Sequence, residues 1–245
     1  MDVWIYPALV LGGILCGVIN ALAGGGSFVT LPLLLLFGLP PQVANATNRV
    51  AIVLQCASGT ATYHRHKVLP WRHVPGLAVA MVLGAIPGAL LASYADESLF
   101  RKVAAVLFAV MIVTVFVDPK RWVRQKAVAR IRLRLYPVFF LLGIYGGFLQ
   151  AGIGTLLISI FVLVGGYDVV RGNALKFALA LIFSIAALLT FASTGQVEWI
   201  PGLILAAGSV TGGSLGARLV IAKGAGWIRY VVVVSAAGAI LKLLL

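Results

Sequence analysis

Two basic residues lie where a charge is expensive to bury. Arg49 and Lys176 each fall near the first turn of a long apolar segment, just after Asn45-Ala46-Thr47-Asn48 and Asn173-Ala174-Leu175 respectively. A basic residue at the centre of a bilayer costs about 2.5–3.5 kcal/mol or more. The chemistry that such cations offer is the binding of an anion. The alternative is that each side chain extends from a helix end to a lipid headgroup.

Glycine clusters precede both cations. Gly24-Gly25-Gly26 and Gly152-Ile153-Gly154 each interrupt an apolar stretch. A helix that begins after such a break points its positive dipole end and free N–H groups inward, and glycine lets the backbone approach a ligand closely. Together with nearby hydroxyls and amides, these groups predict a binding site for a small oxyanion. Its candidate residues are Gly24, Gly25, Gly26, Ser27, Asn45, Asn48, Arg49, Gly152, Gly154, Thr155, Asn173 and Lys176.

Carboxylates are placed where they cannot serve such a site. All six fall in termini or loops: Asp2, Asp96, Glu97, Asp118, Asp168 and Glu198. Proton relays and intramembrane catalysis commonly use buried carboxylates or histidines, and the three histidines cluster around one loop, at 64–73. We therefore expect no catalytic residues, no metal site and no cofactor, and a protein that is not an enzyme.

The composition indicates the class of protein. Of 245 residues, 62% are hydrophobic and 10% are charged, whereas a soluble domain is about a quarter charged. The net charge of +13 matches the enrichment of Lys and Arg in cytoplasmic loops, so we expect no nucleic-acid partner. The sequence predicts an all-α, multi-pass protein of a bacterial or archaeal plasma membrane. Its expected partners are the bilayer and a small anionic substrate, and a homodimer stays open.

The apolar segments divide into two kinds. Six are long enough to span a membrane at about 20 residues each: 44–63, 73–94, 99–117, 170–193, 198–221 and 226–245. Two longer stretches, 3–38 and 135–164, contain the glycine breaks. The apolar run after the first break is too short to span a membrane but long enough to form a helix that crosses half of it. We therefore predict that the broken stretches form re-entrant or V-shaped segments.

An internal repeat organises these segments. A shift of 128 residues without gaps superposes identical residues in the two halves, including Asn, Trp and Arg, which chance rarely aligns. The pairs are Gly24/Gly152, Gly26/Gly154, Gly38/Gly166, Asn45/Asn173, Ala46/Ala174, Trp71/Trp199, Gly84/Gly212, Gly88/Gly216 and Arg101/Arg229. We therefore predict a first membrane repeat at 1–118, a basic cytoplasmic linker at 119–134 and a second membrane repeat at 135–245. The pairs Gly84/Gly88 and Gly212/Gly216 are expected to serve close helix packing.

The distribution of charge predicts the orientation of the repeats. If each broken stretch crossed the membrane once, the repeats would be parallel, with 11 basic residues on one side of the membrane and 6 on the other. If each broken stretch enters and returns on the same side, the repeats are inverted, with 14 basic residues inside and 3 outside. The second division obeys the positive-inside rule far better. We expect two inverted repeats, each with one broken segment and three spanning helices, and both termini outside.

Both halves resemble a known family. The segment GVINALAGGGSFVTLPLLLLFGLPPQVANATN at 17–48, followed by YHRHKVLPW at 63–71, is similar to the N-terminal motif of the TauE/SafE family of sulfite-exporter-like membrane proteins. The segment GFLQAGIGTLLISIFVLVGGYDVVRGNALK at 147–176 resembles the family's degenerate second copy. In that copy Lys176 stands where the first has Asn48, and Ile153 separates its glycines.

The resemblance implies export of a small sulfur-containing anion such as sulfite or sulfoacetate. Two alternatives stay open. One is transport of another small organic anion. The other is a module without transport activity that acts on acidic lipids or a partner through the basic linker.

Overall fold

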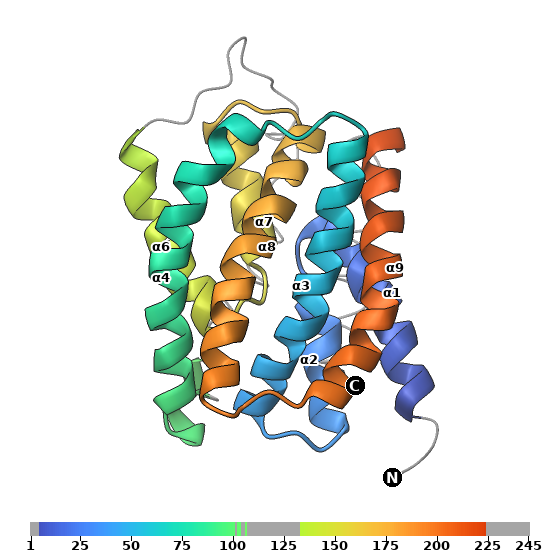
Figure 1. Cartoon of the computed structure of the whole chain (residues 1–245), viewed down its shortest axis with the longest axis vertical. Coiled ribbons are helices and arrows are strands. Elements are labelled where there is room, and N and C mark those ends of the chain that lie inside the picture. Colours follow the sequence, from blue (N-terminus) through green and yellow to red (C-terminus); the bar gives the residue numbers. More distant parts are fainter. Residues whose placement is uncertain (1–4, 101, 104–105, 107–132, 224–245) are drawn as a thin grey trace.

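The computed structural model describes residues 5–100, 102–103, 106 and 133–223, and every regular element within them is helical. The helices form a bundle of long, steeply aligned rods with shorter helices packed among them (Figure 1). The predicted spans 99–117 and 226–245 and the linker 119–134 lie wholly or largely outside the described residues.

The described residues of the first half contain five helices with complete bounds. In chain order they are α1 (Ile5–Ala23), α2 (Ser27–Leu36), α3 (Pro41–Arg65), the short 3-10 helix η1 (Trp71–His73) and α4 (Val74–Tyr94). Gly24 breaks the path between α1 and α2 with a left-handed φ of 79°, a conformation that glycine adopts without steric cost. Pro40 and Pro41 begin α3, where the missing proline N–H has no intrahelical acceptor in any case.

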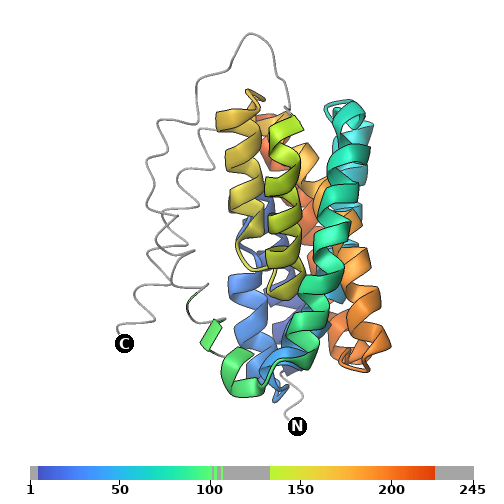
Figure 2. The ribbon, with the colours of Figure 1, turned by 90° about the vertical axis from the view of Figure 1, so that its left-hand side faces the viewer.

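The second half follows the same plan. Its helices are η3 (Leu133–Leu135), α6 (Tyr136–Phe148), α7 (Ile153–Ser159), the π-helical turn η4 (Ile160–Val164), α8 (Val169–Ser193) and α9 (Trp199–Lys223). Figure 2 shows the α1–α2 pair towards one end of the bundle and the α6–α7 pair towards the other. The predicted helices at 44–63, 73–94, 170–193 and 198–221 are confirmed as helices, and both glycine-broken stretches are interrupted where the sequence predicts.

In the described part of the chain, four helices are long and apolar enough to cross a membrane: Tyr6–Ala23, Trp71–Tyr94, Val169–Ser193 and Trp199–Lys223. α3 is not among them although it has 25 residues, because polar residues are frequent along it. These polar side chains are mostly buried against other helices, including those of Asn45, Asn48 and Gln55. α1 is longer than half a crossing, since its 19 residues rise about 28 Å at 1.5 Å per residue.

Left-handed backbone positions recur at the spacing of the sequence repeat. Gly24 and Gly152 have φ of 79° and 76°, and Gly38 and Gly166 have φ of 93° and 75°. Lys67 and Gly195, again 128 residues apart, have φ of 58° and 70°. The repeat in the sequence is therefore also a repeat in backbone conformation, at each break and in the loops that follow.

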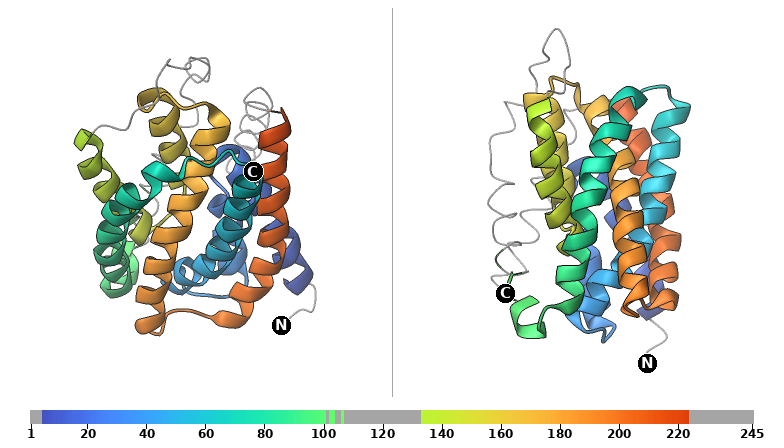
Figure 3. Two further views of the ribbon diagram at one scale, coloured as in Figure 1. Left: turned by 45° about the horizontal axis from the view of Figure 1, so that its top comes forward. Right: turned by 60° about the vertical axis from the view of Figure 1, so that its left-hand side comes forward.

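Glycines allow the helices of the two halves to pack closely. α1 packs on α9, and α6 packs on α4 (Figures 1 and 3). A Cβ on Gly212 would lie 2.2 Å from the carbonyl oxygen of Ile14, and one on Gly84 would lie 2.1 Å from that of Phe140. The packing role predicted for Gly84/Gly88 and Gly212/Gly216 is confirmed, because only residues without a side chain fit at such contacts.

We expect Gly212→Val to lower the stability of the folded protein by about 1–3 kcal/mol, the usual cost of overfilling a packed interior. Thermal unfolding of the detergent-purified protein measures the effect. Ala207→Val is the matched control, because Ala207 lies on the exposed face of the same helix. Equal midpoints for the two variants would contradict a tight contact between α1 and α9.

Candidate functional site

The two glycine breaks touch inside the bundle. A Cβ on Gly24 would lie 2.3 Å from the amide nitrogen of Thr155, and one on Gly154 would lie 2.7 Å from the Cα of Gly24. Neither position can therefore accept a side chain without moving the backbone of the other break. The glycines bring the C-terminal ends of α1 and α6 and the starts of α2 and α7 together.

Side chains from α3 cap the end of α6. The last four carbonyls of a helix have no intrahelical donor, and here they lie in the interior of the protein. Arg49 Nη1 and Nη2 donate to the carbonyls of Gly146 and Gly147 at 2.6 and 2.7 Å, and Asn45 Nδ2 donates to that of Phe148 at 2.9 Å. The guanidinium carbon also lies 5.4 Å from the ring centroid of Phe191. Arg49 is fully buried, so it does not extend to a lipid headgroup.

Side chains from the second half cap the end of α1 in return. Lys176 Nζ donates to the carbonyl of Asn20 at 2.6 Å, and Asn173 Nδ2 donates to that of Ala21. Thr155 Oγ1 donates to the carbonyl of Ala23 at 2.6 Å. A cation near a helix C-terminus also interacts favourably with the helix dipole. Each half of the chain therefore supplies side-chain donors to the end of the broken helix in the other half.

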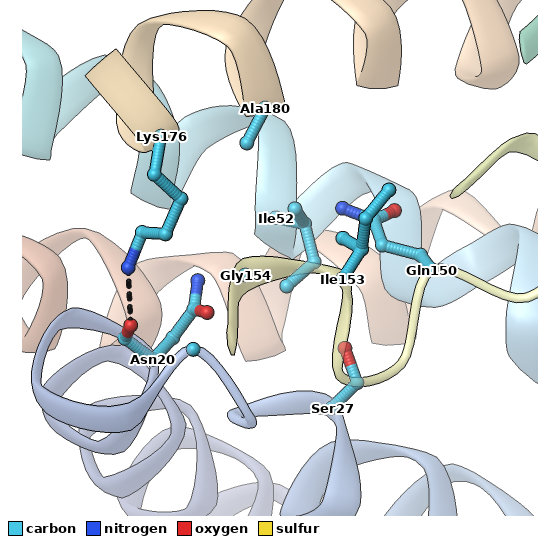
Figure 4. A pocket seen from close by; sticks show the side chains of 9 residues that line it. Asn20, Ser27, Ile52, Gln150, Ile153, Gly154, Lys176 and Ala180 are labelled. Carbon is cyan, nitrogen blue, oxygen red and sulfur yellow. Dashed lines mark hydrogen bonds between the residues drawn. The ribbon is translucent and has the colours of Figure 1, made fainter. Parts of the chain in front are cut away.

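A small cavity lies between the two breaks, and Lys176 reaches it (Figure 4). Both breaks, α3 and α8 contribute to its wall. The lining residues are Asn20, Gly24, Ser27, Ile52, Gln150, Ile153, Gly154, Lys176 and Ala180. Lys176 is 1% exposed and forms no ion pair with any carboxylate of the described residues. Within the described part of the chain, its ammonium contacts the Asn20 carbonyl and the face of Phe177, whose ring centroid lies 4.3 Å away.

The structure brings four predicted site residues to the cavity: Gly24, Ser27, Gly154 and Lys176. Asn48 supports this group from behind, since its Nδ2 donates to Ser27 Oγ at 3.3 Å. The other predicted residues do not line the cavity. Asn45, Arg49, Thr155 and Asn173 cap the helix ends, whereas Gly25, Gly26 and Gly152 form the turns of the breaks.

Asn20 and Gln150 line the cavity but are not among the predicted site residues. Both are buried amides within otherwise apolar stretches. A buried amide is costly unless it is hydrogen-bonded, so its presence in such a stretch is the signal in the sequence that points to them.

Comparison with known proteins identifies the chain at the level of the family. The model of a family described as sulfite exporter TauE/SafE matches residues 9–243. This match spans nearly the whole chain. The chain belongs to the TauE/SafE family. The resemblance seen in the sequence is thereby confirmed, and the protein is a multi-pass membrane transporter.

TauE/SafE relatives match over most of their length as well. A probable membrane transporter protein of Haemophilus influenzae is 28% identical over 91% of this chain and 88% of its own. The probable membrane transporter protein YfcA of Escherichia coli is 30% identical over 94% of this chain and 86% of its own. The probable membrane transporter protein YunE of Bacillus subtilis is 20% identical over 87% of this chain and 88% of its own. No solved structure shows a significant match to the chain.

We expect Arg49→Met to destabilise the protein by about 2 kcal/mol or more, because a buried carbonyl left without a donor costs about 1–3 kcal/mol and this change affects two. Arg49→Lys should recover only part of the loss, since a lysine cannot reproduce the two-pronged contact. Thermal unfolding in detergent measures both. Arg171→Met serves as the control, because the Arg171 side chain is 63% exposed. An Arg49→Met variant as stable as wild type would refute the capping role.

Proposed function

We propose that this transporter exports a small sulfur-containing oxyanion, such as sulfite or sulfoacetate, through the cavity between the two breaks. The observation that carries the proposal is the environment of Lys176: a buried ammonium that faces a cavity and has no carboxylate partner among the described residues. Uncompensated buried charge is costly, and an anion in the cavity would compensate it. The class of substrate comes from the family and from the charge of the site.

Of the two cations, Lys176 is the better substrate ligand. Both terminal nitrogens of Arg49 already donate to carbonyls, and Arg49 does not line the cavity. The Lys176 ammonium has three N–H donors and makes one hydrogen bond within the described residues. It can therefore keep the Asn20 carbonyl and still bind an oxyanion. Ser27 adds a hydroxyl to the wall of the cavity.

The direction of transport follows from the membrane potential. An inside-negative potential favours the exit of an anion by about 2.3 kcal/mol per charge per 100 mV. Among the described residues, carboxylates lie only at or next to the ends of helices, at Asp96, Glu97, Asp168 and Glu198. The proposed export therefore relies on the potential and the gradient of the anion rather than on a carboxylate relay.

We further propose that the two halves are inverted repeats whose broken segments enter from opposite sides of the membrane. The opposite placement of the α1–α2 and α6–α7 pairs supports this (Figure 2). The ends of α3 and α9 and the starts of α4 and α8 also share one end of the bundle (Figure 1). That end carries Arg65, Lys67, Arg72, Arg171 and Lys223 together with Asp168, whereas the opposite end carries Asp96, Glu97 and Glu198 together with Lys102. By the positive-inside rule the basic end is cytoplasmic.

Reporter fusions test this topology. Fusions after Lys67 and after Asp168 should give cytoplasmic signals, because both loops lie at the basic end of the bundle. A fusion after Gln196 and fusions at both termini should give external signals. A cytoplasmic signal from the two termini would refute the inverted arrangement.

We expect Lys176→Gln to reduce sulfite efflux from proteoliposomes by at least about tenfold while the protein remains folded. Glutamine carries no charge and is one atom shorter than lysine, so the change removes the anion ligand and weakens the contact with the Asn20 carbonyl. Efflux of trapped sulfite measures the effect, and unfolding temperature checks the fold.

Arg72→Met is the matched control for charge, because Arg72 is exposed at the basic end of the bundle. It should transport as wild type does. Sulfite efflux at the wild-type rate by Lys176→Gln would refute the site. Efflux of an organic carboxylate but not of sulfite by the wild-type protein would keep the site and change the substrate.

A further inference from the structure

The start of α3, the end of α4 and the loop between α8 and α9 all lie at one end of the bundle, the lower end in Figure 1. Gln42 Nε2, near the start of α3, donates to the carbonyl of Ala95, just beyond α4, at 2.5 Å. Gln196 Nε2, from the loop, donates to the carbonyl of Ser93 in α4 at 2.8 Å. The end of α4 is therefore bonded both to α3 and to the loop that follows α8.

A third hydrogen bond joins α3 to the same loop. Thr47 Oγ1, in the first turns of α3, accepts from the backbone amide of Glu198 at 3.0 Å. All three side chains bind backbone groups, so the donor and the acceptor of each bond are fixed by chemistry. We call Gln42, Thr47 and Gln196 the latch. It connects α3 with α4, α4 with the loop, and the loop with α3, and so joins the two halves of the chain.

At the opposite, basic end of the bundle, the corresponding residues cannot form such bonds. A shift of 128 residues places Val170 for Gln42, Leu175 for Thr47, Val68 for Gln196 and Pro70 for Glu198. Valine and leucine side chains have no hydrogen-bonding group, and proline has no backbone N–H. Val68, Val170 and Leu175 instead belong to or pack against one apolar cluster. The latch is therefore a feature of one end of the repeated fold and is replaced by apolar contacts at the other.

The latch joins the helices that form the wall of the cavity. α3 contributes Ile52 to that wall, and α8 contributes Lys176 and Ala180. From these residues both helices continue to the latched end, and they pack against each other. Opening the cavity towards this end requires α3 and α8 to separate there. Hydrogen bonds need a defined geometry, so the separation breaks them, whereas apolar contacts are non-directional and let the helices at the basic end shift.

We propose that the latch keeps the cavity closed towards the outside, so that without substrate the cavity opens in preference to the cytoplasm. The inference rests on the anion site and the topology proposed above and specifies how access to that site is controlled. In an exporter, this arrangement loads the anion from the cytoplasm and restricts its return from outside.

Access of a thiol reagent to the cavity tests the inference. Ala180→Cys places a reporter thiol in the cavity wall, in a full-length chain whose two native cysteines are replaced by Cys16→Ala and Cys56→Ala. Ile52→Cys is a second reporter, on α3. Labelling by a membrane-impermeant maleimide is followed without substrate in right-side-out and inside-out membrane vesicles, and thermal unfolding checks the fold of each variant. We expect faster labelling in inside-out vesicles, in which the cytoplasmic side faces the reagent.

Gln42→Met combined with Gln196→Met removes two donors of the latch and keeps side chains of similar length. One hydrogen bond changes a conformational equilibrium by about fivefold, so labelling from outside should rise at least about tenfold with both removed, whereas labelling from the cytoplasmic side should not rise. Thr190→Val combined with Ser193→Ala is the matched control. These two hydroxyls lie towards the same end and donate to carbonyls of α8 itself, so the control should label as the unchanged reporter does.

Three results would overturn the inference: labelling of the unchanged reporter as fast from outside as from inside, external labelling that the latch variant does not raise, or an equal rise from both sides. Failure of the proposed function looks different. Wild-type protein that carries no sulfite in liposomes, or a Lys176→Gln variant that carries it normally, refutes the function. Because labelling needs neither substrate nor transport, and the reporter fusions identify the external side independently, the role of the latch is still decided in that case.

Discussion

Two helices end inside this protein, and their last carbonyls must find donors there. In the hydrocarbon region water cannot supply them, and each unpaired group costs several kcal/mol. The chain meets this constraint reciprocally. Arg49 and Asn45 of the first half bind the end of α6, and Lys176 and Asn173 of the second half bind the end of α1. Each half also supplies donors at its own break, as the Gly24 amide does for the Asn20 carbonyl. The side-chain donors at both helix ends nevertheless come from the opposite half, so the two halves stabilise each other.

The same constraint explains the glycines. Long polar side chains on α3 and α8 reach the helix ends only if the two breaks meet at the centre. Gly24 and Gly154 permit that contact, since a Cβ on either would collide with the other break. Further from the centre, Gly84 lets the backbone of α4 contact that of α6, and Gly212 lets the backbone of α9 contact that of α1. Small residues therefore let the helices pack closely, and this packing brings the polar side chains within reach of the buried helix ends. Small and polar residues also mediate helix association in membranes in general.

The sequence predicts the helices, the position of both breaks and the packing glycines, because hydropathy and glycine spacing are local signals. It also indicates that Arg49 and Lys176 are buried. It does not reveal what they contact, because the carbonyls of Gly146 and Asn20 lie 97 and 156 residues away along the chain. Every residue has a backbone carbonyl, so the residue types at these positions do not indicate that their carbonyls accept hydrogen bonds. For the same reason the sequence treats the two cations alike, whereas their surroundings differ. The polarity of α3 is equally a consequence of burial against other helices, which no local pattern discloses.

The difference between the two cations matters for function. If the two caps were perfectly symmetric, the donors of both cations would all bind helix carbonyls, and no cation would be left to bind a ligand at the centre. Arg49 approaches that limit, with two carbonyls and an aromatic ring around its guanidinium. Lys176 instead binds one carbonyl and faces a cavity. Gln150, whose backbone conformation also has no counterpart in the first half, lines the same cavity. The two departures from the repeat thus coincide in space, at the cavity that we propose as the anion site.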